Sequence, residues 1–141
     1  MQTDHVIALI SAVRYRSVQF LERELKARGV ADLRPSQGAL LSSLWGRGGK
    51  ATMRELLESS SRKKSTLTEM ANKLERSGYL RRRPDPDDAR GVTLELTEKA
   101  AGIEESFDAI SGLLLERAWH SFTQDEKETL ISLLERMRGN F

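Results

Sequence analysis

The sequence contains no cysteine among its 141 residues. This absence excludes disulfides, thiol nucleophiles, thiol redox sensing and any zinc site with cysteine ligands. Histidine is also scarce, since only His5 and His120 are present, near opposite ends of the chain. The sequence holds no cluster of titratable residues of the kind that catalysis requires. We therefore expect no enzymatic activity, no metal site and no cofactor.

Long apolar runs are missing as well. No segment approaches the roughly 20 apolar residues that cross a bilayer as a helix. The first five residues, Met-Gln-Thr-Asp-His, are polar and lack the basic start of a secretory signal. These features predict a cytoplasmic protein without a membrane partner. The length favours one domain, large enough to bury about two-thirds of its unfolded surface without disulfides or metals.

Charge is distributed unevenly along the chain, although the net charge is only +2. Residues 47–91 hold 12 basic and 7 acidic side chains, whereas residues 92–141 hold 5 and 10. A basic segment in a chain with an acidic end suggests a site for a polyanion, most simply a nucleic acid. The alternative is a charged surface that only keeps the protein in solution.

Apolar residues recur at the helical period in several segments. The expected helices cover residues 4–28, 35–45, 52–58 and 62–77, followed by two more that begin after Thr97 and Thr123. Thr52 with Glu55, and Thr123 with Glu126, have the spacing of a capping box. Thr97 is expected to cap the helix that follows it.

Between Val92 and Leu96 the apolar period changes to two, which predicts a half-buried strand. Residues 79–83 are its expected partner, and the proline-rich segment 84–91 is expected to form the tip of the hairpin. The fold class is therefore mostly α with a small β-hairpin wing (α+β). A short helix, a longer helix and a hairpin, in this order, are typical of a winged helix-turn-helix. The helices at both ends carry apolar faces without a partner in the chain, which predicts a dimer.

Several segments resemble the MarR family of bacterial transcriptional regulators. Residues 56–78 are similar to its helix-turn-helix, and residues 83–90 are similar to its wing, with an Asp-x-Arg signature at Asp88 and Arg90. Residues 33–41 and 92–97 also resemble family segments. The resemblance implies a single MarR-type domain over residues 1–141. Its winged helix-turn-helix lobe would span residues 33–100, and residues 1–30 and 101–141 would form dimerisation helices.

The predicted DNA-binding surface combines the fourth helix, its start and the wing. Short polar side chains on the helix face opposite the core suit the major groove, and flanking cations suit phosphates. Asn72 can pair bidentately with adenine. Glu69 either accepts from cytosine or pairs with Lys73, and the ion pair is the favoured interpretation. The full set of expected DNA-binding residues is Arg62, Lys63, Lys64, Ser65, Thr66, Thr68, Glu69, Asn72, Lys73, Arg76, Arg82, Arg83, Asp88 and Arg90.

The wing supplies a second set of contacts. The resemblance implies that Arg90 enters the minor groove and that Asp88 orients it. A narrow minor groove concentrates negative potential, which attracts a guanidinium group. The alternative is an Asp88–Arg90 salt bridge that only stabilises the turn. Alternate arginines among residues 81–83 are expected to face the DNA backbone.

The resemblance implies a homodimeric repressor that binds a pseudo-palindromic operator in double-stranded DNA. It also implies release by a small-molecule effector that binds between the dimerisation helices and the lobe. Trp45, Tyr15 and Phe20 either line such a pocket or belong to the core. The alternative function is a winged-helix module that binds other proteins and has no specific affinity for DNA.

Overall fold

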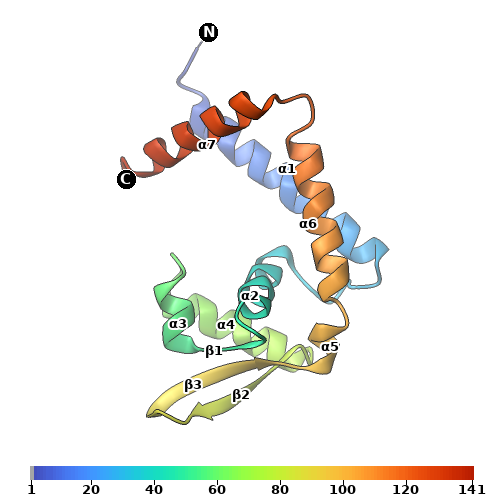
Figure 1. Cartoon of the computed structure of the whole chain (residues 1–141), viewed down its shortest axis with the longest axis vertical. Helices are drawn as coiled ribbons and strands as arrows, with labels where there is room; N and C mark the ends of the chain where they lie inside the picture. Colours follow the sequence, from blue (N-terminus) through green and yellow to red (C-terminus); the bar gives the residue numbers. More distant parts are fainter. Residues whose placement is uncertain (1) are drawn as a thin grey trace.

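A computed structural model describes residues 2–141 of the chain. These residues form seven helices and a three-stranded antiparallel sheet. Helices α2 to α5 and the sheet make a lobe, and the longer helices α1, α6 and α7 lie on one side of it (Figure 1). The elements are α1 Val6–Ala27, α2 Pro35–Trp45, β1 Lys50–Thr52, α3 Met53–Glu58, α4 Lys64–Arg76, β2 Leu80–Asp85, β3 Asp88–Leu96, α5 Glu98–Ala101, α6 Glu104–Ala118 and α7 Gln124–Arg138.

The lobe has a continuous apolar core. Leu41 and Leu44 of α2, Leu74 of α4 and Leu94 of β3 have no exposed surface. The predicted stripe of α4 is buried along its whole length, so the helix is fixed with its polar face outward. Burial of one such leucine stabilises the fold by about 1.5–3 kcal/mol.

The sheet differs from the expectation in two ways. A short strand, β1, pairs with β3, and the strand order is β1-β3-β2. The predicted hairpin tip, residues 84–91, is mostly strand, because β2 continues to Asp85 and β3 begins at Asp88. Pro84 is tolerated in β2 because this strand lies at the edge of the sheet. The wing is therefore longer than expected and its turn is shorter.

The two capping boxes are confirmed, but the cap at Thr97 is not. The hydroxyl groups of Thr52 and Thr123 accept hydrogen bonds from the amides of Glu55 and Glu126. The hydroxyl of Thr97 instead donates to the carbonyl of Gly78 at 2.5 Å. The helix expected after Thr97 is divided into α5 and α6.

The helices outside the lobe leave much apolar surface exposed. Val13 of α1 is 60% exposed, and Ile131 and Leu133 of α7 are 50% and 45% exposed. No residue of α7 is buried. Within residues 2–141, no helix has the length and apolar character needed to cross a membrane.

Close contacts join the outer helices and the segment after α1 to the lobe, and two of them are important here. Gly38 of α2 lies so close to α6 that a methyl group on its Cα would stand 2.5 Å from Cε1 of Phe107. In the second contact, the hydroxyl of buried Tyr79 donates to Oδ1 of Asp32 at 2.6 Å, and Nζ of Lys99 donates to Oδ2 at 3.0 Å. The hydrogen bond from Tyr79, with the help of Lys99, lowers the pKa of Asp32. We call Asp32, Tyr79 and Lys99 the link cluster.

Candidate nucleic-acid interface

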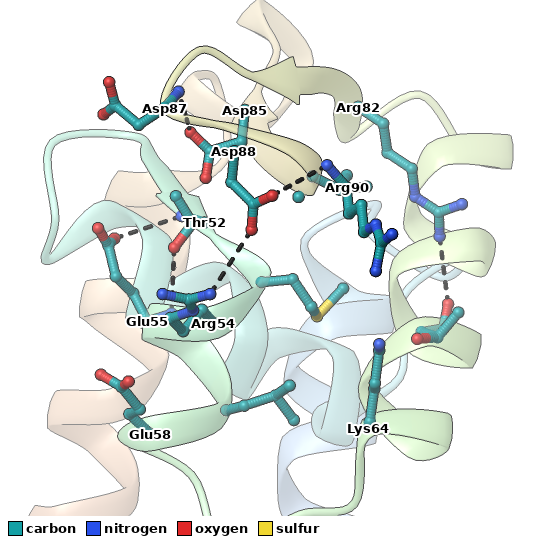
Figure 2. A pocket seen from close by; sticks show the side chains of 15 residues that line it. Thr52, Arg54, Glu55, Glu58, Lys64, Arg82, Asp85, Asp87, Asp88 and Arg90 are labelled. Atoms are coloured by element: carbon teal, nitrogen blue, oxygen red, sulfur yellow. Dashed lines mark hydrogen bonds and ion pairs between the residues drawn. The ribbon is translucent and has the colours of Figure 1, made fainter.

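A hollow of about 790 Å³ separates the wing from helices α3 and α4. Figure 2 shows Lys64 of α4 and Arg90 of β3 pointing into the same space from opposite sides. Arg54 of α3 and several acidic side chains of the wing also line this hollow. The arrangement places positive charge on two walls of one concave surface. Among residues 2–141, no group of His, Asp and Glu side chains is arranged to hold a metal ion.

The exposed face of α4 carries most of the predicted side chains. Ser65, Thr66, Glu69 and Arg76 are exposed, whereas Thr68 and Asn72 are half-buried on the side toward the wing. Because the apolar stripe is buried in the lobe, this polar face is available to a groove-binding partner.

The helix begins two residues later than the predicted start at Arg62. Lys64 is its first residue, and Lys63 occupies the N-cap position without a side-chain hydrogen bond. Arg62 lies in the preceding turn, where its Nη1 is 3.2 Å from the sulfur of Met70. No acidic residue lies in the first turn of α4. Cations at a helix start oppose its dipole, so a bound anion would compensate both the lysines and the free amides.

Glu69 and Lys73 form the predicted ion pair. Nζ of Lys73 is 3.2 Å from Oε1 of Glu69, four residues apart on the same helix. Both side chains are at least half exposed, so the pair contributes only about 0.2–0.5 kcal/mol to stability. Glu69 thus partly neutralises a cation of the surface.

Arg82 is placed differently from the expected contact with the DNA backbone. Its side chain reaches from β2 to α4 (Figure 2), where Nη2 donates to the carbonyl of Thr68 at 3.3 Å. The same nitrogen donates to Oδ1 of Asn72. The backbone amide of Arg82 donates to Oε2 of Glu75 at 3.1 Å. Arg82 therefore joins the wing to α4, and the oxygen that Asn72 would use in a bidentate contact with adenine already accepts one hydrogen bond from Arg82.

The neighbouring arginines of the wing are paired across the hairpin. Nε of Arg83 is 2.8 Å from Oε2 of Glu95, and Nη2 of Arg81 is 3.6 Å from Oε1 of the same carboxylate. Arg83 thus shares its charge with Glu95, and its contact with the DNA backbone stays a prediction. Antiparallel pairing places Glu95 directly opposite Arg81, which explains the contact between these two side chains.

Asp88 orients Arg90 through the backbone. The amide of Arg90 donates to Oδ1 of Asp88 at 3.0 Å. Oδ2 of Asp88 lies 3.5 Å from Nη2 of Arg54, and the structure of residues 2–141 shows no ion pair between Asp88 and the Arg90 guanidinium. The alternative interpretation, a salt bridge within the turn, is thus not seen among these residues, and Asp88 instead forms an ion pair between the wing and α3. Arg54 was not among the predicted residues, because nothing in its local sequence indicates a partner in the wing.

Comparisons with known proteins agree with this architecture. The model of the MarR family matches residues 33–92. The uncharacterized HTH-type transcriptional regulator YkoM of Bacillus subtilis is 34% identical over 106 residues, which are 72% of this chain and 66% of that protein. The HTH-type transcriptional regulator SarZ of Staphylococcus haemolyticus is 35% identical over 75 residues, 53% of this chain and 50% of that protein. The matched part thus spans half to two-thirds of these relatives.

Solved structures match over nearly the whole length of the chain. The reduced form of MarR from E. coli is 30% identical, with 92% of this chain and 93% of that chain covered and a TM-score of 0.71. A mutant of the same protein, complexed with operator DNA, is 28% identical with a TM-score of 0.81, covering 97% and 99%. Sequence, element order and three-dimensional arrangement therefore agree, and the chain belongs to the MarR family of transcriptional regulators.

Proposed function

We propose that this protein is a cytoplasmic, sequence-specific DNA-binding repressor that acts as a homodimer without a cofactor or enzymatic activity. The observation that carries the proposal is the convergence of Lys64 and Arg90 on one hollow beside the exposed polar face of α4. A helix with short polar side chains suits the major groove, and cations on either side suit the phosphates. The operator structure of the MarR mutant supports the same kind of partner.

The wing provides the second DNA contact in this proposal. Arg90 is exposed near the end of the hairpin, and Asp88 fixes its backbone. An exposed ion pair between Asp88 and Arg54, with 3.5 Å between Oδ2 and Nη2, links the hairpin to α3. A guanidinium held in this position suits a narrow minor groove next to the site of α4.

The homodimer is supported by the exposed apolar side chains of α1 and α7. Large exposed apolar surfaces usually mark an interface. Two copies related by a two-fold axis would place two recognition helices on half-sites about 34 Å apart. The operator is therefore expected to be pseudo-palindromic.

A small-molecule effector has one candidate site among the outer helices. A hollow of about 500 Å³ lies between α1 and α6, lined by Phe20 and Leu114 and by three arginines, Arg16, Arg23 and Arg117. Its composition suits a small aromatic anion. Of the other predicted pocket residues, Trp45 instead packs on Phe107 with ring centroids 5.2 Å apart, and Tyr15 is 64% exposed.

The salt dependence of DNA binding tests the proposed function. The purified protein is used to select from random duplexes, and its affinity for the selected site is measured at several salt concentrations. The logarithm of the affinity should fall by about 0.9 per neutralised phosphate for each tenfold increase in salt. Selection of no sequence, or an affinity independent of salt, would favour the protein-interaction module. Benzoate is a suitable probe for the effector site, and it should weaken binding if the arginines hold an anion.

A further inference from the structure

Asn72 is the only half-buried amide on the face of α4 that carries the predicted base contacts, and Arg82 determines which way this amide points. A guanidinium group has five donors and no acceptor. The atom of Asn72 that faces Nη2 of Arg82 must therefore be the carbonyl oxygen. This chemistry fixes the orientation of the amide, so the NH₂ group is the part that remains unoccupied.

Arg82 is itself held firmly in this position. The bond between its backbone amide and Glu75 fixes the start of the wing against α4. Its guanidinium is divided between the carbonyl of Thr68 and the amide of Asn72, and its Nε is buried without a hydrogen-bond partner in the described chain. Because the guanidinium is bonded to α4 and the aliphatic part of the side chain is partly buried, Arg82 is not free to reach a phosphate.

The orientation of Asn72 changes what it can recognise. A bidentate contact with adenine needs the amide oxygen to accept from N6 and the NH₂ group to donate to N7. Because Arg82 takes one lone pair of the oxygen and turns it toward the wing, the NH₂ group is the freer part of the amide. An NH₂ group suits a base edge with acceptors, and guanine offers two of these, N7 and O6, in the major groove, whereas adenine offers only N7.

We propose that Arg82 is a specificity-determining residue. By holding the amide oxygen of Asn72, it makes Asn72 recognise guanine as a hydrogen-bond donor in place of a bidentate contact with adenine. Arg82 acts through Asn72 and contacts no base. The proposal rests on the proposed DNA-binding function, and it assigns to a cation of the wing a role other than phosphate binding. It also explains why the basic side chain points toward α4 although phosphates are the expected partner of wing arginines.

Selection from random duplexes tests the proposal with the full-length protein and two variants. Asn72→Ala identifies the base pair that Asn72 reads, because preference should be lost at that position of each half-site alone. In the parent protein this position should prefer guanine. Arg82→Met retains the length of the side chain but removes its donors, so the amide is released and the preference at the same position should move toward adenine by about tenfold.

Arg83→Met is the matched control, since it removes one charge from the same strand at a side chain that contacts Glu95 and not α4. This variant should leave the base preference unchanged. Adenine at the Asn72 position of the parent protein would overturn the proposal, even if Arg82→Met fails to fold. Uniform weakening of all sequences by Arg82→Met, with an unchanged preference, would also overturn it. If the parent protein selects no sequence at all, the proposed function itself fails.

Discussion

The lobe and the outer helices differ in how much of their apolar surface is buried: the outer helices bury Phe20, Leu25 and Ile110 but leave many other apolar side chains exposed. Leu41 and Leu94 in the lobe have no exposed surface, whereas Val13 of α1 and Ile131 of α7 are 60% and 50% exposed. The lobe thus completes its core within one chain. The outer helices present a surface that one chain does not cover, so their amphipathic pattern specifies assembly as well as folding. Mutations in the two regions should therefore have different consequences.

The largest effect on operator binding is expected when charge is introduced on the exposed face of α7. The double substitution Ile131→Asp and Leu134→Asp should produce monomers, because it places carboxylates in the proposed interface. Affinity for a full operator should fall by about 10²–10⁴-fold, since the gain from bivalent binding is lost. Sedimentation and binding to full and half operators measure the two effects separately.

Ser132→Asp is the control for this prediction, because it adds charge to the same helix at a position that is already polar. It should retain the dimer and full affinity. A double variant that remains a dimer with unchanged affinity would place the interface on another part of the molecule.

Two leucine-to-alanine variants, one in the lobe and one in α7, test the difference between the two regions. Leu41→Ala should lower the free energy of unfolding by about 2–5 kcal/mol at every protein concentration, because it leaves a cavity in the lobe. Leu133→Ala, at a 45% exposed position of α7, should instead make the melting temperature more dependent on concentration. Thermal melts and urea unfolding, each at several protein concentrations, distinguish these outcomes. Identical behaviour of the two variants would mean that the regions do not differ as proposed.

The link cluster lies between the two regions, and its loss should lower the free energy of unfolding by an intermediate amount. Asp32→Ala leaves the hydroxyl of Tyr79 without its acceptor, and Tyr79 is only 1% exposed. The expected loss is about 1–3 kcal/mol. Tyr79→Phe removes the hydroxyl itself and should cost less than Asp32→Ala. A larger loss for Tyr79→Phe would show that the hydrogen bond to the Asp32 carboxylate, and not the unsatisfied hydroxyl, dominates.

The same carboxylate should give the stability a dependence on pH. The pKa of Asp32 is lowered from its ordinary value of 3.8, chiefly by the hydrogen bond from Tyr79. A group with a lowered pKa in the folded state stabilises the protein above its unfolded pKa, and this contribution is lost as the pH falls below that value. Thermal melts between pH 7 and pH 3 should therefore show a smaller acid-induced loss for Asp32→Asn than for the parent.

The smallest effect on stability is expected in the wing. Arg90→Ala should melt within about 1 kcal/mol of the parent, because an exposed charge contributes little to folding. Its operator affinity should nevertheless fall several-fold. Asp88→Ala and Arg54→Ala should show smaller losses of affinity, since both act on the position of the hairpin. A lowered melting temperature with full affinity would assign a purely structural role to Arg90.

Local patterns predicted most of the fold. The stripe of α4, the capping boxes at Thr52 and Thr123, and the order of the elements are encoded in residues close to one another in the sequence. The strand β1 was missed because three residues are too few to show a period of two, and its partner β3 is distant in the sequence. The length of the wing was underestimated because Pro84 indicates a turn. Proline is compatible with a strand at the edge of a sheet, but the sequence does not show which strand lies at the edge.

The candidate site was harder to predict in detail. The positions of the exposed residues on α4 follow from the helical period, so their common face was predicted correctly. The direction of a long arginine side chain does not follow from any local pattern. Arg82 and Arg83 were expected to contact DNA, and their partners within the chain, Asn72 and Glu95, were not foreseen. Such contacts depend on how the wing approaches α4, which only the assembled fold determines.

The edge position of β2 has a further consequence, which concerns aggregation. Along a strand, every second amide points to the same side, so the amides of residues 82 and 84 share one direction. Glu75 accepts from the amide of Arg82, and Pro84 has no amide hydrogen. The outer edge of the wing thus offers few free donors to a strand of another molecule, and charged side chains with a proline at an edge oppose such pairing. The protein can therefore extend a long hairpin away from its lobe with little risk of forming a continuous sheet between chains.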